Sequence, residues 1–291
     1  MRLTGFLVIA LAALGLWVAS ADAAKLRTVA RSGVVGGGAT GPTGTTTVVA
    51  RCPKGTKAVS GGFAISVPRI LDAELSSRWF VVSESMMTPR GDGWRVSGSE
   101  HFPVPAISQF TAYAYCEKRR KSILVGGTAR TDTIPSLVGQ TTGNTARCPK
   151  GTAAISGGFK TSSTDAYFNR SSGSGRNWNV EVTNVGATTQ NTYDVQAYCV
   201  RGKVQRVGAP VVIPDSGGPT SGAVTIAKTP GCRKGRFVRG GGYAASPPAA
   251  GLDSGPVVFG DVLARSGWKV SALSISGSPQ SFSIFGYCRP G

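Results

Sequence analysis

The sequence predicts an all-β protein made of three tandem, disulfide-closed units, and three observations support this. Glycine accounts for 41 of the 291 residues, while valine, threonine and serine are plentiful and helix-favouring stretches are scarce. One pattern of cysteine, paired glycine, tryptophan and tyrosine–cysteine occurs three times. All six cysteines belong to these copies. We therefore expect three small antiparallel sandwich or barrel units, each closed by one disulfide.

Residues 1–24 are typical of a secretory signal peptide. Arg2 precedes an apolar run over residues 5–18, and small residues in an Ala-x-Ala arrangement follow it. The run is too short for a membrane span, and no later stretch approaches 18 apolar residues. We therefore expect a soluble mature protein without a transmembrane segment, secreted and able to associate with the cell envelope.

The repeat divides the mature chain into units 25–117, 118–200 and 201–291. Each copy starts at a cysteine, has a glycine pair nine and ten residues later, and then has an aromatic residue, a Trp-x-Val and a closing Tyr-Cys. The members are Cys52, Cys148 and Cys232; Phe63, Phe159 and Tyr243; Trp94, Trp178 and Trp268; and Tyr115–Cys116, Tyr198–Cys199 and Tyr287–Cys288. Such regular spacing indicates one structural module written three times.

The cysteines predict three disulfides, since an even number in an exported protein favours pairing. Six cysteines allow about 15 connectivities, but joining the first and last cysteine of each copy gives one repeated scheme. The predicted bridges are Cys52–Cys116, Cys148–Cys199 and Cys232–Cys288. In the chain-entropy model each closure stabilises its unit by about 4 kcal/mol, a large share for a small unit.

About six short strands are expected in each unit. A Val/Gly-rich strand opens each unit at 26–35, 123–130 and 204–213, and a Gly/Pro/Thr/Ser loop leads to the strand before the first cysteine. The Cys-Pro-Lys-Gly segment suits a type I turn with proline second and glycine fourth. The three units could line up as separate beads, which the internal bridges favour, or close around one pseudo-threefold axis as a prism or trefoil.

Strand alternation orients the repeated side chains. In the closing strand the residues in phase with cysteine are apolar in all three copies, so we expect that face in the core. Tyr115, Tyr198 and Tyr287 lie on the opposite phase and should face outward or sit at a rim. The Trp-x-Val strands have polar neighbours, so we assign Trp94, Trp178 and Trp268 to the core, over the glycine pair. We also place Phe63, Phe159 and Tyr243 in the core. Ligand stacking on the tryptophans is the alternative.

Catalytic chemistry is hard to assemble from this sequence. His101 is the only histidine, the cysteines are assigned to bridges, and the carboxylates occupy no repeated position. We therefore predict a non-enzyme with no catalytic residue, no metal and no cofactor. A hydrolase or a hydrolase inhibitor remains an alternative, either around His101 or as a glycosidase pair among Asp72, Glu74, Glu84, Asp92, Glu100, Asp165, Glu181 and Asp194.

Charge carries the clearest functional signal. The chain has 32 Lys and Arg against 14 Asp and Glu, a net charge of +18, with basic clusters at 118–121 and 233–239. Each unit keeps a turn lysine: Lys54, Lys150 and Lys234. We expect binding to an anionic wall polymer or acidic polysaccharide through these lysines and Tyr115, Tyr198 and Tyr287. No nucleic-acid module is recognisable, so sequence-specific binding is not expected. A structural surface protein without a defined ligand is the alternative, and the sequence specifies no oligomeric state.

The pattern Cys-Pro-x-Gly, Gly-Gly-aromatic, Trp-x-Val and Ala-Tyr-Cys resembles a disulfide-closed β repeat of exported proteins from Gram-positive, especially actinobacterial, bacteria. The resemblance covers nearly the whole mature chain and is strong in the first two copies; in the third, Arg233 replaces the proline. It implies export and a disulfide-closed β unit. No activity is assigned to that repeat, so it implies no functional residues.

Overall fold

A computed structural model of the protein describes residues 26–35, 45–66, 80–100, 108–118, 123–124, 130–186, 190–214, 224–245, 256–273 and 279–291. The predicted signal peptide, His101 and residues 119–121 lie outside these ranges. The described residues form nineteen strands and no helix, and their strand pairings are antiparallel. The all-β prediction is confirmed.

The strands follow the three sequence repeats. The first repeat contains β1 (Arg27–Val35), β2 (Thr46–Arg51), β3 (Thr56–Ser66), β4 (Phe80–Met87), β5 (Gly93–Glu100) and β6 (Ser108–Lys118). The second contains β7 (Ile123–Leu124), β8 (Arg130–Ile134), β9 (Thr141–Arg147), β10 (Thr152–Thr161), β11 (Ala166–Ser174), β12 (Asn177–Asn184) and β13 (Asn191–Arg201). The third contains β14 (Gln205–Ile213), β15 (Val224–Lys228), β16 (Arg236–Ala245), β17 (Val257–Ala264), β18 (Gly267–Leu273) and β19 (Gln280–Pro290).

Each repeat forms a sandwich-like unit of two short layers. In the first unit, β1-β6-β3 is one layer and β2-β5-β4 is the other. Cys52 follows β2 and Cys116 lies in β6, so their disulfide ties the two layers together. The equivalent bridges Cys148–Cys199 and Cys232–Cys288 are also present, with Cα–Cα distances of 5.7 and 5.9 Å. The predicted sandwich-like units and their bridges are confirmed.

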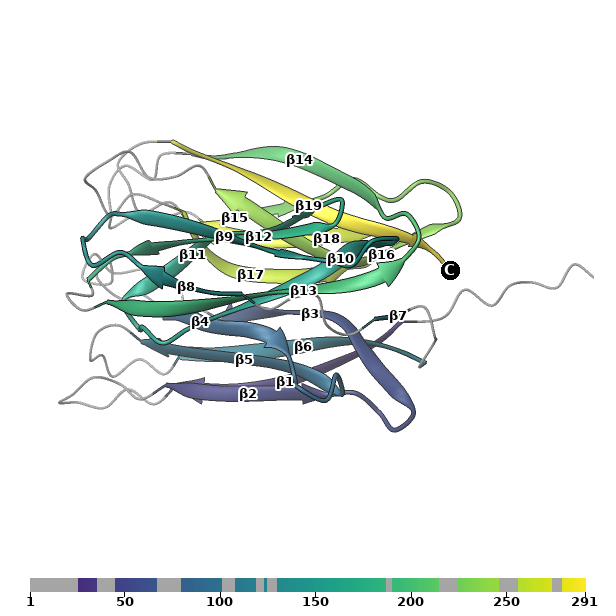
Figure 1. The fold of residues 1–291 in the computed structure, drawn as a ribbon, viewed down its shortest axis with the longest axis horizontal. Helices are drawn as coiled ribbons and strands as arrows, with labels where there is room; N and C mark the ends of the chain where they lie inside the picture. Colours follow the sequence, from purple (N-terminus) through teal and green to yellow (C-terminus); the bar gives the residue numbers. More distant parts are fainter. Residues whose placement is uncertain are drawn as a thin grey trace, which may run out of the picture.

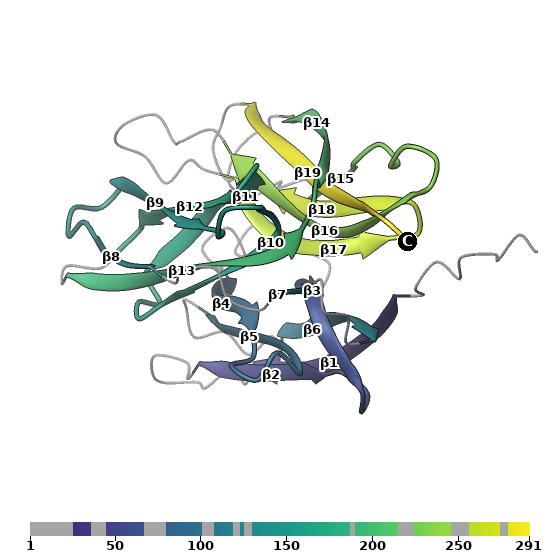
Figure 2. The same cartoon turned by 45° about the vertical axis from the view of Figure 1, so that its right-hand side comes forward.

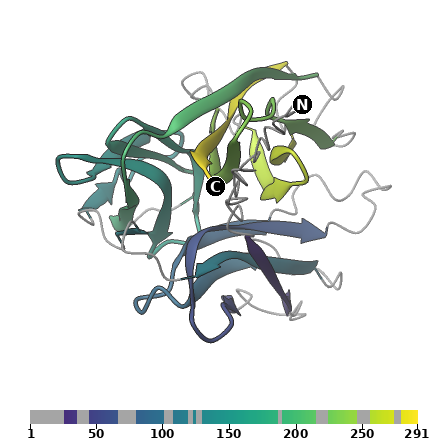
Figure 3. The ribbon, with the colours of Figure 1, turned by 90° about the vertical axis from the view of Figure 1, so that its right-hand side faces the viewer.

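The sheets continue from one unit into the next. Strand β4 pairs with β10, β11 pairs with β16, and β17 pairs with β3, each through a short antiparallel register. The result is three sheets in the orders β1-β6-β3-β17-β18-β15, β2-β5-β4-β10-β13-β7 and β14-β19-β16-β11-β12-β9, with β8 also paired to β13. Figure 3 shows the three lobes gathered around one centre, and Figure 2 shows the first unit below the other two.

The units are therefore joined around a pseudo-threefold axis, and the expectation of separate beads is wrong in this respect. A disulfide inside each copy closes the sandwich but leaves the inner edges of β3 and β4, and of their counterparts, without partners. Unpaired strand edges expose backbone hydrogen-bonding groups. Pairing with the next unit satisfies those groups, which explains why closure into a ring is preferred.

The two glycines of each repeated pair permit two different close contacts. A Cβ added to Gly61 would lie 2.1 Å from Trp94 of the same unit, so this glycine admits the indole ring. A Cβ on Gly62 would lie 1.7 Å from the carbonyl oxygen of Asp261, so this glycine admits the strand of the neighbouring unit. The other two pairs show the same division. The repeated Gly-Gly therefore encodes both the internal packing and the junction.

One hydrophobic core spans all three units. Phe63, Phe159 and Tyr243 are buried, and they surround a small cavity of about 20 Å³ together with side chains from β4, β11 and β17. Trp94, Trp178 and Trp268 are each no more than 1 % exposed. All six aromatic residues assigned to the core are therefore buried, and the buried cluster is continuous from unit to unit.

A second shared feature lies where β3, β10 and β16 each bulge. The bulged residues are Val59, Ile155 and Arg239, and all three are buried. Arg239 replaces an apolar side chain here, and its guanidinium Nη1 lies 3.0 Å from Oε1 of Glu117 in the first unit. This buried ion pair spans the junction between the first and third units, where the ring closes without a direct chain connection.

Candidate anion-binding surface

The three tyrosines predicted to face outward are buried at the unit junctions. Tyr115, Tyr198 and Tyr287 are each at most 2 % exposed. Each hydroxyl accepts a hydrogen bond from a backbone N–H of the neighbouring unit. The donors are Leu263 for Tyr115 and Met87 for Tyr198, both at 2.7 Å, and Gly173 for Tyr287.

Each of these tyrosines also packs against the tryptophan of the neighbouring unit, with ring centroids 5.3 to 5.6 Å apart. Burial raises the pKa of all three hydroxyls well above the usual value. The predicted strand phase is correct, but the outward position is wrong because the next unit covers that face. We therefore assign these tyrosines to the junctions and not to a ligand site.

The three repeated lysines are exposed, as a ligand contact requires. Lys54, Lys150 and Lys234 each lie in a tight turn that starts one residue later than predicted. Lysine is the second residue of the turn, and the third is a glycine with φ near +80°. The first turn residue is proline in two units and Arg233 in the third, and its carbonyl accepts the closing hydrogen bond in all three. Since this position does not require proline, the third unit keeps the turn.

The antiparallel registers place all three lysine turns at one end of the molecule. Arg51 lies opposite Gly93 and Arg147 opposite Asn177, so the turns after β4 and β11 lie at this end too. The three disulfides also lie here, because each starts at the cysteine just before a lysine turn. The C-terminus lies at the same end, at the right in Figure 1 and toward the viewer in Figure 3. We call this region the cysteine end.

Positive charge gathers at the cysteine end. Its basic residues include Arg51, Lys54, Lys57, Arg90, Arg147, Lys150, Arg176, Arg201, Lys203, Lys228, Arg233, Lys234, Arg236, Arg265 and Arg289. Within the described ranges, the acidic residues here are Asp92 and Glu117, and each is paired with an arginine. The other described acidic residues, Glu84, Glu100, Asp132, Asp165, Glu181, Asp194 and Asp261, lie further along the strands.

Asp92 offsets the charge of Arg51 and leaves most of the positive charge at this end in place. Its carboxylate accepts a hydrogen bond from the Thr88 hydroxyl at 2.6 Å and pairs with Arg51 at 3.1 Å. The hydrogen bond from Thr88, helped by the charge of Arg51, holds the pKa of Asp92 below its usual value. Asp92 is therefore already engaged within the protein.

A cavity of about 460 Å³ opens at the cysteine end beside β16 and the turn between β17 and β18. Arg236, Arg239 and Arg265 line it, with Phe237, which is 44 % exposed. Nη1 of Arg236 is buried and has no hydrogen-bond partner among the described residues. The described residues that line this cavity include no acidic side chain. A buried guanidinium nitrogen in such a cavity can donate to a carboxylate, phosphate or sulfate oxygen.

Sequence reasoning missed this charge distribution because the basic residues are dispersed along the chain. They converge only once the strand directions are known. A usable signal was present, since many of them lie within a few residues of the repeated cysteines.

The carboxylates considered for a hydrolase are partly placed by the structure. Glu84 pairs with Arg95, and Glu181 pairs with Arg170, across neighbouring strands. Asp72, Glu74 and His101 lie outside the described residues. In the described part of the chain, histidine, cysteine and carboxylate side chains form no group of three that could hold a metal ion. The same part contains no helix long and apolar enough to cross a membrane. No protein-family model matches the chain, and no curated protein matches it at a significant level.

Proposed function

We propose that this chain is an exported, non-catalytic protein that binds anionic polymers of the cell envelope or extracellular matrix through its cysteine end. The observation that carries the proposal is the segregation of basic side chains to one end, with the acidic residues of that end already paired. A surface of one charge raises the local concentration of polyanions and speeds their association.

The threefold arrangement supports binding to a polymer in particular. One exposed lysine turn of each unit lies at the cysteine end, and the three turns share the same closing hydrogen bond and a glycine with φ near +80°. Each turn is a weak site, but a polymer with repeated charges can touch more than one, and the linked contacts add avidity. The arginine-lined cavity beside β16 offers a stronger contact among them.

The disulfides are consistent with the location that the proposal requires. Three bridges and no free cysteine among the described residues fit an extracellular or otherwise oxidising environment. A protein in that compartment meets anionic wall polymers and acidic polysaccharides directly.

The test is retention of the full mature protein on immobilised poly(glycerol phosphate) across a salt series. We expect retention at low ionic strength that falls steeply with salt, because surface charges are screened. Replacing Lys54, Lys150 and Lys234 by glutamine should elute the protein at clearly lower salt. The matched control replaces three exposed basic residues away from the cysteine end: Arg31, Arg130 and Lys160.

If the two triple variants elute at equally lowered salt concentrations, retention depends on net charge and not on a particular surface. This result would overturn the assignment to the cysteine end. No retention by the wild-type protein at low salt would overturn the binding function and favour a structural surface protein.

A further inference from the structure

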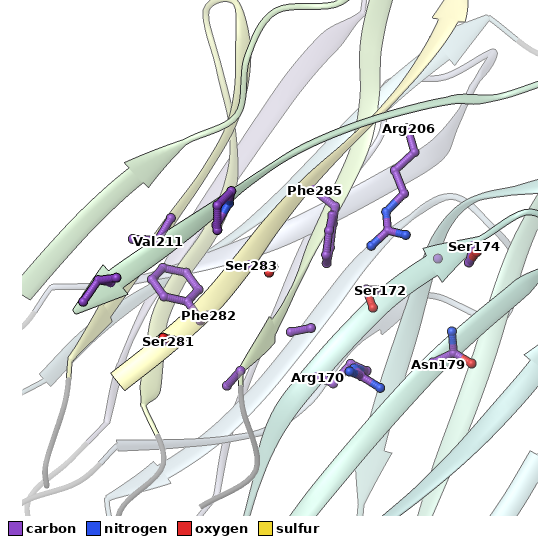
Figure 4. Close-up of a pocket in the computed structure, with 15 residues that line it drawn as sticks. Arg170, Ser172, Ser174, Asn179, Arg206, Val211, Ser281, Phe282, Ser283 and Phe285 are labelled. Carbon is purple, nitrogen blue, oxygen red and sulfur yellow. The ribbon is translucent and has the colours of Figure 1, made fainter. Parts of the chain in front are cut away.

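A second cavity of about 460 Å³ lies on the face of the sheet β14-β19-β16-β11-β12-β9, where the second and third units meet. Figure 4 shows side chains from both units pointing into it. It runs along the strands from Arg206 and Ser174 toward Ser281 and is distinct from the cavity beside the lysine turns. We call it the sheet groove.

Each unit contributes one arginine to the sheet groove. Arg206 of β14 lies over the ring of Phe285 in β19, with its guanidinium carbon 3.7 Å from the ring centroid. This cation–π contact holds the guanidinium over the ring, and guanidinium N–H groups can donate to both oxygens of a carboxylate. Arg170 of β11 is held by Glu181, and its buried Nε has no hydrogen-bond partner among the described residues.

Neutral polar groups lie around the two arginines. The hydroxyls of Ser172, Ser174 and Ser283 and the amide of Asn179 line the groove, and none of the described residues that line it has a carboxylate. Arginine pairs well with carboxylate oxygens, and hydroxyl and amide groups can both donate and accept hydrogen bonds to sugar hydroxyls. The combination fits a ligand that carries one carboxylate and several hydroxyls.

The other two sheets provide an internal comparison. The indole N–H of each repeated tryptophan donates to Ser85, Ser171 or Asp261, which aligns the three units at this point. Arg170 therefore corresponds to Glu84 and Gly260. Counted from the closing cysteine, Phe285 corresponds to Tyr113 and Gln196.

The same comparison applies to the remaining wall. Arg206 lies opposite Tyr287, and in the first unit Thr28 lies opposite Tyr115, so Arg206 corresponds to Thr28. Ser283 corresponds to Thr111 and Asp194. The fold forms in the other sheets without these arginines, so folding does not require them. On the sheet that contains β4 and β13, Glu84 stands in place of Arg170 and is paired with Arg95, and Asp194 stands in place of Ser283.

We propose that the sheet groove binds one acidic sugar residue of the uronic acid type, with its carboxylate on Arg206 and Arg170 and its hydroxyls on the serines and Asn179. This inference goes beyond the proposed polymer binding and does not depend on it. The cysteine end attracts charge density, whereas the sheet groove recognises a single residue by shape and hydrogen bonding.

The test is titration of the full mature protein with glucuronate. Binding is measured by NMR chemical-shift changes and by calorimetry, and glucose and inorganic phosphate are the comparison ligands. We expect saturable one-to-one binding of glucuronate and at least about tenfold weaker binding of glucose, since charge-assisted hydrogen bonds are lost. Arg206→Gln should weaken glucuronate binding by about tenfold or more. Arg31→Gln, which removes an exposed arginine from the corresponding edge strand β1, is the matched control and should bind normally.

Ser283→Asp is a second variant that the fold should tolerate, because the second unit has Asp194 at this position. It should abolish glucuronate binding without changing the melting temperature. Equal affinity for glucose and glucuronate, equal or tighter binding of phosphate, or normal binding by Arg206→Gln would each overturn the proposal. The Arg206→Gln variant should still be retained on poly(glycerol phosphate), so failure of this inference is distinguishable from failure of the polymer-binding function.

Discussion

Asp261 occupies a position where the other two units have serine. The indole N–H groups of Trp94 and Trp178 donate to the hydroxyls of Ser85 and Ser171 at 3.0 and 3.1 Å, whereas that of Trp268 donates to the Asp261 carboxyl. This carboxyl is buried beside the junction with the first unit. Burial raises its pKa from 3.8 to about 7, and the hydrogen bond from Trp268 offsets part of that shift.

A folded-state pKa above the unfolded-state value means that the folded protein prefers the protonated carboxyl. The stabilising contribution of Asp261 is therefore complete below about pH 4 and is lost as the pH rises toward 7. A shift of about three pH units corresponds to about 4 kcal/mol of unfolding free energy at neutral pH and above. The expected slope inside this window is about 1.4 kcal/mol per pH unit.

The perturbation is Asp261→Ser, which installs the residue that the other units use. Any packing change is independent of pH. The pH dependence of the difference in unfolding free energy between variant and wild type therefore reports on the carboxyl alone. We expect this difference to rise by about 4 kcal/mol in favour of the variant between about pH 4 and pH 8. The assay is denaturant unfolding across that range with the disulfides intact.

Asp92→Ser provides a control of opposite sign. The pKa of Asp92 is lowered, so its stabilising contribution is lost only as the pH falls below the usual aspartate range. The difference in unfolding free energy between this variant and the wild type should therefore be constant between pH 5 and pH 8, to within about 0.5 kcal/mol. Parallel stability profiles for the wild type and Asp261→Ser would refute the reasoning about Asp261.

Three further predictions concern the junctions. Gly62→Ala should destabilise the protein by about 3 kcal/mol or more, because the new methyl group meets the backbone of the neighbouring unit; an unchanged denaturant midpoint would contradict this. Tyr198→Phe should cost about 1 to 3 kcal/mol, since it leaves a buried backbone N–H without its acceptor, and a thermal melt that matches the wild type would count against the junction role. Glu117→Val should cost about 3 kcal/mol by leaving Arg239 buried without its carboxylate, whereas adding Arg239→Ile should restore stability. A double variant no more stable than the single one, measured by urea unfolding, would exclude this account.

Much of the architecture could be predicted from the repeat. The first and last cysteine of each copy are bridged, and the period-two pattern of the Trp-x-Val strands correctly places Trp94, Trp178 and Trp268 in the core. These features depend on neighbours within one copy, where sequence spacing is a good guide to position.

Features that depend on contacts between copies could not be predicted in this way. Alternation places Tyr198 on the face opposite Cys199, but it does not indicate that Trp94 of another unit lies against that face. Likewise, the second glycine of each pair marks a close approach without naming the strand that approaches. The gathering of the lysine turns also requires the relative directions of strands in different units.

The charges of the described residues are distributed unevenly along the pseudo-threefold axis, which gives this part of the molecule a permanent electrical polarity. Near a flat, negatively charged wall, such a body experiences a torque as well as an attraction. It would stand upright, with its bridged pole against the wall and its opposite pole toward the medium, so that every adsorbed copy displays the same surface outward.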